Sequence, residues 1–163
     1  MNQYFFEEHS IKVVIFHHEN NITRVELHTE TTNQIPNTDI PRKAQTVERY
    51  IRKYLQGTIK ELPLELITPL RLPQFQEKIL RVLRKEIPYG TTTTYGKLAE
   101  YAGHTGAARA TGCALRGNPY PLFFPCHRVI RSDGKIGSFA GSAKNMILKK
   151  MLIDLEQSEK IQR

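Results

Sequence analysis

A proline-bearing segment from Thr68 to Pro73 divides the chain into two parts whose apolar residues follow different patterns. Before it, short β-branched runs alternate with polar residues, as in strands. After it, apolar residues recur at helical spacing. A chain of 163 residues is long enough for two small lobes, so we expect two domains, residues 1–70 and 71–163. The expected class is α+β, a mixed α/β lobe followed by a mainly helical domain.

The first domain is expected to hold a hairpin and a helix. The runs 11–16 and 22–28 flank a polar turn and favour paired strands. Apolar residues at helical spacing over 47–55 predict a helix that stops at Gly57. Residues 62–67 fit a further strand at a sheet edge, because their proline cannot donate to a ladder.

The second domain is expected to begin with an amphipathic helix near residues 75–87. Two short helices, 95–101 and 107–116, follow around the glycine-bearing turn 103–106. This is the shape of a helix-turn-helix, which commonly binds DNA. A plain helical hairpin has the same pattern, so shape alone leaves both possibilities open.

Charge is distributed unevenly between the two domains. Residues 1–70 carry eight Lys or Arg and nine Asp or Glu, whereas residues 71–163 carry sixteen and seven. All of the excess behind the net charge of +8 therefore lies in the second domain. This asymmetry favours a polyanionic partner over a basic surface kept only for solubility.

The helix expected at 107–116 has an unusual composition. Most of its residues are small, and only Arg109 projects far from its first turns. A helix that reads the major groove would carry several long polar side chains. A smooth helix with one arginine suits close approach to a backbone or shallow groove, with the arginine entering the base stack. Tight helix packing explains the small residues equally well, and Cys113 is expected to be one such packed residue.

Cys113 and Cys126 are the two cysteines of the chain, and its N-terminus lacks the order of a secretory signal. We therefore expect a reducing compartment, the cytoplasm or a nucleus, and no disulfide. No apolar run reaches membrane-spanning length. A zinc site could be built from His17, His18 and His28, but solvated strand-end histidines are the simpler interpretation. We predict no metal and no cofactor.

The segment Pro125-Cys126-His127-Arg128 places a thiol beside two basic side chains. A thiol is a strong nucleophile only as thiolate, and the neighbouring cations are expected to favour that form. Adjacent residues of an extended segment point to opposite faces. Cys126 and His127 can therefore cooperate only across a turn or through a bridging water. A buried cysteine beside a surface histidine is the plainer interpretation of such a pair taken alone.

Four motifs stand in order along the second domain: Tyr95, Arg109-Ala110-Thr111-Gly112, Gly117-Asn118-Pro119 and Pro125-Cys126-His127-Arg128. Together they closely resemble the O6-alkylguanine-DNA alkyltransferases, over roughly residues 72–156. The resemblance implies a ribonuclease H-like first lobe and a helix-turn-helix that docks in the minor groove. It also implies a monomer that moves the alkyl group of O6-alkylguanine, and of O4-alkylthymine, from double-stranded DNA to its own cysteine. Each molecule would act once.

The resemblance assigns catalytic roles residue by residue. Cys126 would attack the alkyl carbon, after His127, oriented by Glu156, had deprotonated it through a water. Tyr95 would donate to the flipped base, and Asn118 would hold the turn at the thiol. The base would also be contacted by Val129, Ser138, Phe139 and Ala140.

The resemblance assigns DNA contacts as well. Arg109 would fill the gap left by the flipped nucleotide, and the other contacts would come from Tyr95, Gly96, His104, Gln76 and Ser132. Where the family commonly has tyrosine and a hydroxyl residue, this chain has Phe139 and Ala140, so polar contacts are lost. The stretch 142–148 is also longer than usual, so Glu156 holds its assignment only if the extra residues precede Lys149.

Two other classes of protein share parts of this pattern. A DNA-binding module without catalysis would have the same second domain, but Cys126 argues against it. A cysteine hydrolase would need a base that faces the thiol directly and an oxyanion site. No residue pattern marks either feature, and the basic helix pair would have no purpose in such an enzyme.

Overall fold

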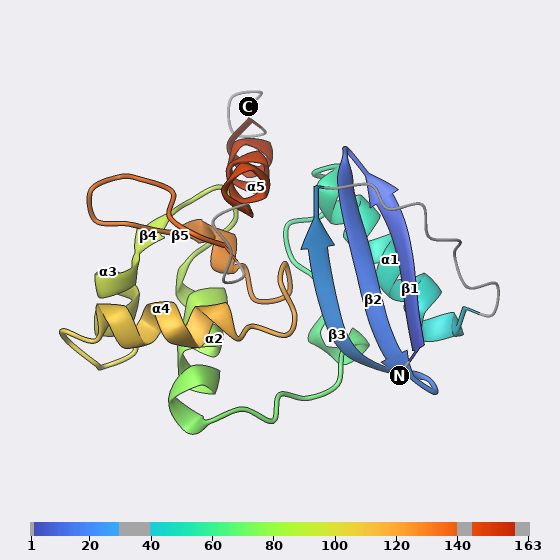
Figure 1. Cartoon of the computed structure of the whole chain (residues 1–163), viewed down its shortest axis with the longest axis horizontal. Coiled ribbons are helices and arrows are strands. Elements are labelled where there is room, and N and C mark those ends of the chain that lie inside the picture. Colours follow the sequence, from blue (N-terminus) through green and yellow to red (C-terminus); the bar gives the residue numbers. More distant parts are fainter. Residues whose placement is uncertain (1, 30–39, 140–144, 159–163) are drawn as a thin grey trace. The chain divides into compact units, whose positions relative to one another are not determined.

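The structure of the protein is a computed structural model, shown in Figure 1. It describes residues 2–29, 40–139 and 145–158. The fold of this described part is mixed α/β, with helices and two small sheets. No helix among the described residues is long and apolar enough to cross a membrane.

Internal contacts divide the chain into two compact units. The first comprises Met1–Pro69 and Pro119–Phe123, and the second comprises Leu70–Asn118 and Phe124–Arg163. The expected domain boundary at residue 70 therefore differs from this division by one short segment. The limits 1–70 and 71–163 stay a prediction.

The sheet of the first unit has three antiparallel strands in the order β1 (Asn2–Glu8), β2 (Ile11–His18) and β3 (Asn21–His28). The predicted hairpin is confirmed, because β2 pairs with β3. The strand β1 was not anticipated. It joins β2 through His9 and Ser10, both with positive φ, as a two-residue hairpin turn requires.

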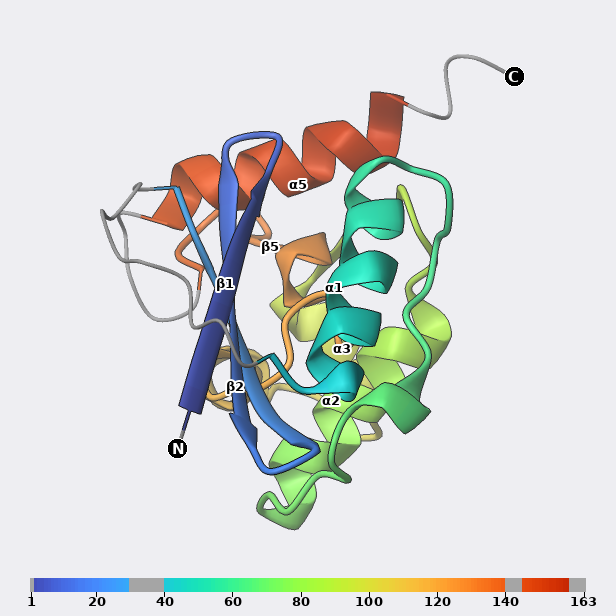
Figure 2. The ribbon, with the colours of Figure 1, turned by 90° about the vertical axis from the view of Figure 1, so that its right-hand side faces the viewer.

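The helix α1 (Arg42–Leu55) packs on this sheet through β1 and β3, and Figure 2 shows it lying along the strands. Its buried residues are Ala44, Val47, Ile51, Tyr54 and Leu55. Gly57 ends it with φ 71°. The strand expected at 62–67 is wrong, since a 3-10 helix, η1 (Leu64–Leu66), stands there. Its first turn closes from the Leu66 amide to the Pro63 carbonyl, and a proline can start such a turn but not a ladder.

Three helices form the body of the second unit: α2 (Gln74–Glu86), α3 (Tyr95–Tyr101) and α4 (Ala108–Arg116). They pack against one another. The predicted helices at 75–87, 95–101 and 107–116 are thus confirmed as helices. The Thr94 hydroxyl accepts from the Lys97 amide at 3.2 Å and caps α3. The turn between α3 and α4 needs positive φ at Gly103 and Gly106.

A short parallel ladder joins the two sequence segments that hold Tyr95 and Cys126. The strand β4 (Thr93–Thr94) pairs with β5 (Val129–Ile130). Tyr95 directly follows β4, and the 3-10 helix η2 (Cys126–Arg128) directly precedes β5. The last helix, α5 (Met146–Ser158), packs on η2. The ladder therefore brings Tyr95 and Cys126 into one site, and α5 covers its inner side.

Candidate active site

The Cys126 thiol is buried, with 6% of the residue exposed. The Asn118 amide donates to its sulfur at 3.1 Å and to the Phe124 carbonyl at 2.8 Å. The Cys126 backbone amide closes back on the same Phe124 carbonyl at 2.8 Å. Asn118 thus fixes both the turn and the direction of the sulfur.

Burial raises the pKa of the Cys126 thiol, although the Asn118 hydrogen bond and the charge of Lys149 oppose this effect. The neighbouring cations were expected to favour the thiolate, but burial has the larger effect on this thiol. Arg128 is bound to a carboxylate, and Arg131 pairs with Asp133 at 3.0 Å on the surface. Desolvation of the sulfur outweighs charges that are already neutralised or exposed to water.

The His127 side chain is fully buried and lies against the last helix. Its Nε2 is 2.5 Å from Oε1 of Glu156. The same carboxylate accepts from the Arg128 guanidinium, with 2.9 Å between Nε and Oε2, and from the Gly90 amide at 2.8 Å. The Glu156 carboxylate is thus held from three sides by η2 and by the turn before β4.

The protonation states of this pair follow from its partners. Burial alone would raise the pKa of Glu156, but the hydrogen bonds from His127 and Arg128 and the charge of Arg128 lower it below its ordinary value. Burial lowers the pKa of His127, although Glu156 opposes the shift. Glu156 is therefore ionised and His127 neutral, so Nε2 carries the proton that it donates to Glu156. Nδ1 keeps its lone pair and makes no hydrogen bond to the described residues.

Lys149 is a buried site residue that the sequence interpretation missed. It is 1% exposed, and its ammonium donates to the Val129 carbonyl at 2.6 Å. It also lies 3.5 Å from the Tyr95 hydroxyl. Burial lowers its pKa to about 8, while the negative charge of a Cys126 thiolate would raise it. The sequence did contain one indication of this position. Residues seven apart share a helix face, and Lys149 stands seven positions before Glu156.

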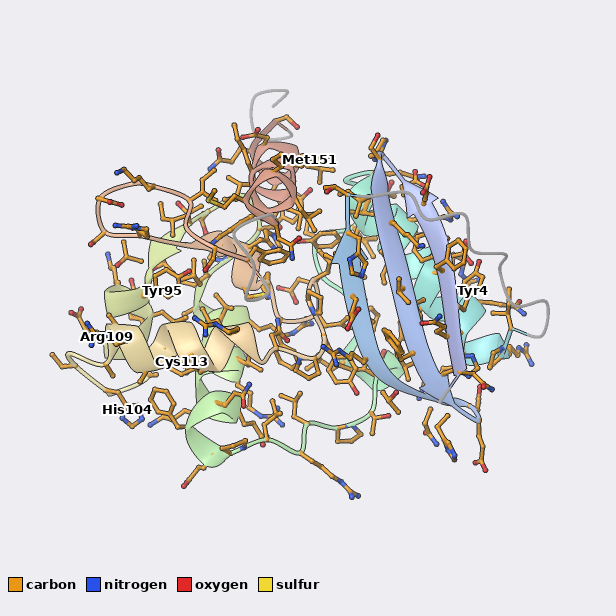
Figure 3. All side chains as sticks on the ribbon, in the orientation of Figure 1. Tyr4, Tyr95, His104, Arg109, Cys113 and Met151 are labelled. Atoms are coloured by element: carbon orange, nitrogen blue, oxygen red, sulfur yellow. The ribbon has the colours of Figure 1, made fainter. Side chains whose placement is uncertain are left out.

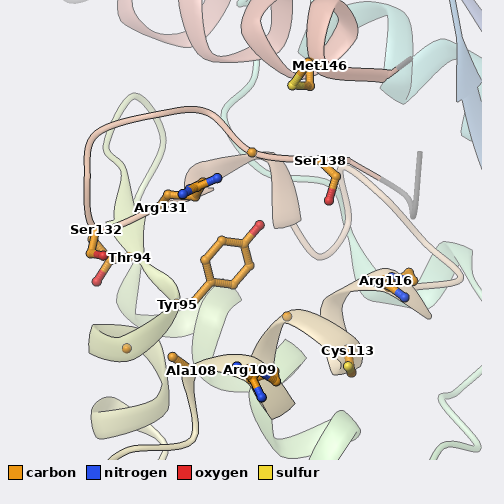
Figure 4. Close-up of a pocket in the computed structure, with 13 residues that line it drawn as sticks. Thr94, Tyr95, Ala108, Arg109, Cys113, Arg116, Arg131, Ser132, Ser138 and Met146 are labelled. Atoms are coloured by element: carbon orange, nitrogen blue, oxygen red, sulfur yellow. The ribbon is translucent and has the colours of Figure 1, made fainter. Parts of the chain in front are cut away.

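Two neighbouring cavities open around Tyr95, as Figure 4 shows for the larger one. The larger cavity measures about 1000 Å³ and lies between α4 and the loop after β5. The smaller cavity measures about 30 Å³ and reaches the Cys126 thiol. Residues common to both linings are Tyr95, Gly112, Arg116 and Ser138. The thiol therefore lies at the inner end of an open, basic-rimmed depression.

Some of the residues expected to contact DNA or the base line these cavities. The larger is lined by Tyr95, Gly96, Arg109, Ser132 and Ser138, and the smaller also by Phe139. Figure 3 shows Arg109 and Cys113 on α4. Arg109 is exposed, as its expected role requires.

Others of the expected contacts are placed elsewhere. Gln76 donates to the Ala114 carbonyl at 2.9 Å, and His104 packs edge-on against Phe75. Neither is among the described residues that line the two cavities. The Val129 carbonyl is bonded to Lys149, and Ala140 lies outside the described residues.

The expectation for Cys113 is wrong, since its side chain is exposed and lines the larger cavity instead of being packed. Cys113 is exposed because it lies on the face of α4 that meets the larger cavity. The composition of the helix does not show which face that is. Among the described residues, no group of three or more His, Cys, Asp or Glu side chains could hold a metal ion.

The fold and site define a class of protein, one that presents a buried cysteine thiol at the end of a basic cavity. The family profile described as "6-O-methylguanine DNA methyltransferase, DNA binding domain" matches residues 74–158, just over half of the chain. The chain therefore belongs to the 6-O-methylguanine DNA methyltransferase family.

Individual members of this family also match the chain in sequence and in structure. The chain is 38% identical over 120 residues to the methylated-DNA–protein-cysteine methyltransferase of Mycolicibacterium paratuberculosis, covering 74% of this chain and 69% of that protein. Identity to the protein of the same name from Methanothermobacter thermautotrophicus is 41%, over 65% of this chain and 57% of that one. The crystal structure of Mycobacterium tuberculosis O6-methylguanine methyltransferase matches with a TM-score of 0.78 and 28% identity, over 96% of this chain and 92% of that one. A further structure is that of Mycobacterium tuberculosis OGT in complex with DNA.

Proposed function

We propose that this chain is a DNA repair protein that transfers the alkyl group of O6-alkylguanine, and of O4-alkylthymine, from double-stranded DNA to its own Cys126. The observation that carries the proposal is the buried Cys126 thiol at the inner end of a cavity lined by Tyr95 and Arg109. Family membership and the names of the relatives support the same reaction.

The first step of the reaction is deprotonation of the Cys126 thiol. The thiol proton passes through a water to Nδ1 of His127, whose Nε2–H is held by Glu156. The sulfur then attacks the alkyl carbon, so that an S–C bond forms while the C–O6 bond breaks. Tyr95 gives its hydroxyl proton to the departing base, which leaves as neutral guanine, and the proton taken up by His127 then passes through water to the tyrosinate. Burial raises the pKa of Tyr95, so its hydroxyl is protonated and able to donate at neutral pH.

Two groups stabilise the sulfur as it becomes charged. The Asn118 amide donates to it, and the Lys149 ammonium lies in the same buried region. Both favour the thiolate against the desolvation that otherwise suppresses it. The cavity at the thiol, about 30 Å³, has room for one water-sized group.

DNA is bound by the second unit, with α3 and α4 acting as a helix-turn-helix and α4 docking in the minor groove. The small residues of α4 allow close approach, and Arg109 occupies the space of the extruded nucleotide. Extrusion costs a few kcal/mol, which this side chain offsets. Residues 71–163 form the DNA-binding and alkyl-transfer domain, and residues 1–70 a ribonuclease H-like lobe. The protein works as a monomer.

The product is a thioether, from which water does not displace the sulfur at useful rates, so each molecule acts once. With methylated duplex DNA in excess, transfer should stop at one methyl group per protein molecule. Mass spectrometry should find the added methylene on the peptide that contains Cys126.

The chain offers a matched control for this experiment. Cys126→Ser should abolish transfer and retain DNA binding, whereas Cys113→Ser should transfer at the normal rate, although Cys113 lines the larger cavity. A second turnover by one molecule, or methyl transfer that persists in Cys126→Ser, would contradict the proposal.

A further inference from the structure

Arg128 is the most firmly held cation of the site, and the reaction described above gives it no task. It is 3% exposed. Its Nε and Nη2 donate to the Glu156 carboxylate at 2.9 to 3.2 Å, and its Nη1 donates to the Ile87 carbonyl at 2.8 Å. Its guanidinium lies 5.7 Å from the Tyr89 ring centre. It is not among the described residues that line either cavity.

The charges around His127 can be counted. Glu156 and Lys149 face it from α5, and Arg128 faces it from η2. The Arg128 guanidinium stays charged at every accessible pH, and Glu156 is the one carboxylate among these groups. With Arg128 as its partner, the Glu156 charge is already balanced. A proton on His127 would therefore add an uncompensated charge to a buried region.

We propose that Arg128 is a positioning residue for alkyl transfer, one that takes the Glu156 carboxylate as its own counterion and so keeps the buried His127 neutral. The lone pair on His127 Nδ1 then stays available for the thiol proton. This inference rests on the function proposed above and assigns a task to a residue that never touches the substrate.

The geometry of the guanidinium suits this task. Its two donors on one edge match the two oxygens of Glu156, while the remaining amine reaches the end of α2 at Ile87. A planar fork of this kind fixes both the distance and the plane of a carboxylate. Glu156 is thereby held where Oε1 meets His127 Nε2. Arg128 thus sets the tautomer of His127 as well as its charge.

Without the Arg128 charge, Glu156 would have His127 as its cationic partner. The buried carboxylate would then draw a proton onto His127, and its pKa would rise. Removing a positive charge this close to His127 raises the pKa of its imidazole by about one unit or more. A protonated His127 cannot accept from the thiol, so the acid limb of the pH–rate profile should move to higher pH.

The test compares Arg128→Gln with Arg128→Lys in the full chain. The two replacements have similar length and can both donate to Glu156, but only lysine keeps the positive charge. The rate of methyl transfer from O6-methylguanine duplex DNA is measured in single turnover between pH 5.5 and 9, and the His127 pKa by NMR of the free protein.

For Arg128→Gln we expect the His127 pKa and the acid limb to rise together by about one pH unit or more. The loss of rate should then be greater at pH 6 than at pH 9, by the ratio of neutral His127 fractions that the two measured pKa values give. Arg128→Lys should keep the His127 pKa and the shape of the wild-type profile, with a lower rate throughout. A uniform loss in both variants, with no change in the His127 pKa, would show a purely structural role and overturn the inference.

The wild-type protein provides a measurement that does not depend on how the variants fold. His127 should be neutral at pH 6, and an imidazole pKa above 7 would overturn the inference. The NMR titration also separates this inference from the proposed function. If His127 behaves as expected but no methyl group reaches Cys126, the electrostatic role of Arg128 stands and the proposed reaction fails.

Discussion

Lys149 and Cys126 share one weakly polar environment, and burial shifts their pKa values in opposite directions. Burial lowers the pKa of Lys149 to about 8 and raises that of the thiol. Each charged form would stabilise the other, because the ammonium and the thiolate attract. At neutral pH, Lys149 is therefore a buried cation, and it becomes the counterion of the sulfur when the Cys126 thiol ionises.

This arrangement predicts a specific dependence of stability on pH. Lys149 binds its proton up to about pH 8 in the folded state and up to about 10.5 when unfolded. The unfolded state holds more protons between these values, so the free energy of unfolding should rise with pH there, by roughly 2–3 kcal/mol. Lys149→Met should abolish that rise.

The comparison is best made in a Cys126→Ser background, because the thiol titrates in the same range. Urea unfolding is measured at intervals from pH 7.5 to 10.5. Lys150→Met is the control, since Lys150 is exposed and paired with Asp154 at 2.7 Å. Equal slopes in Lys149→Met and Lys150→Met would contradict a depressed Lys149 pKa.

At the scale of elements, α4 is held in place by a hydrogen bond from α2. The Gln76 amide donates to the Ala114 carbonyl, and a Cβ on Gly117 would lie 2.5 Å from the Gln76 nitrogen. Gly112 faces the Tyr95 ring, where a Cβ would make an ordinary contact at 3.7 Å. The last turns of α4 are thus fixed, and Arg109 at its exposed first turn can reach a ligand.

Arg109→Ala should therefore impair repair of duplex DNA much more than repair of a single strand. An O6-methylguanine in a single-stranded oligonucleotide needs little extrusion, so the arginine has less to offset. We expect a loss of roughly tenfold to a hundredfold on the duplex and a small loss on the single strand, by single-turnover kinetics. Lys85→Ala, on the exposed face of α2, is the control. Equal losses on the two substrates would show that Arg109 acts in another way.

At the scale of the whole molecule, the excess positive charge belongs to residues 71–163, which also carry the site. If about four phosphates are neutralised on binding, a plot of log K against log salt should have a slope near −3.6. Fluorescence anisotropy with undamaged duplexes between 50 and 200 mM salt would measure it. We expect little dependence on sequence. A flat salt dependence, or strong preference for one undamaged sequence, would favour a different kind of DNA-binding protein.

Several elements could be predicted because their signals are local. The helices α2, α3 and α4 follow from apolar spacing and from the glycines between them, and the β2–β3 hairpin follows from two β-branched runs around a polar turn. The strand β1 was missed because its pattern is weak and its partner, β2, supplies its hydrogen bonds. The segment around Leu64–Leu66 is too short for its pattern to distinguish a strand from a 3-10 turn.

The sequence by itself predicted Cys126 as the nucleophile, and it determined the order of the motifs and the half of the chain that bears the positive charge. These depend on residue types and on spacing along the chain. The tertiary structure alone decided that the thiol is buried and protonated at rest, that Arg128 forms an ion pair with Glu156, and that Lys149 donates to the Val129 carbonyl. The physical reason is that a pKa depends on burial and on the nearest charge in space. Both are set only when α5 packs on η2.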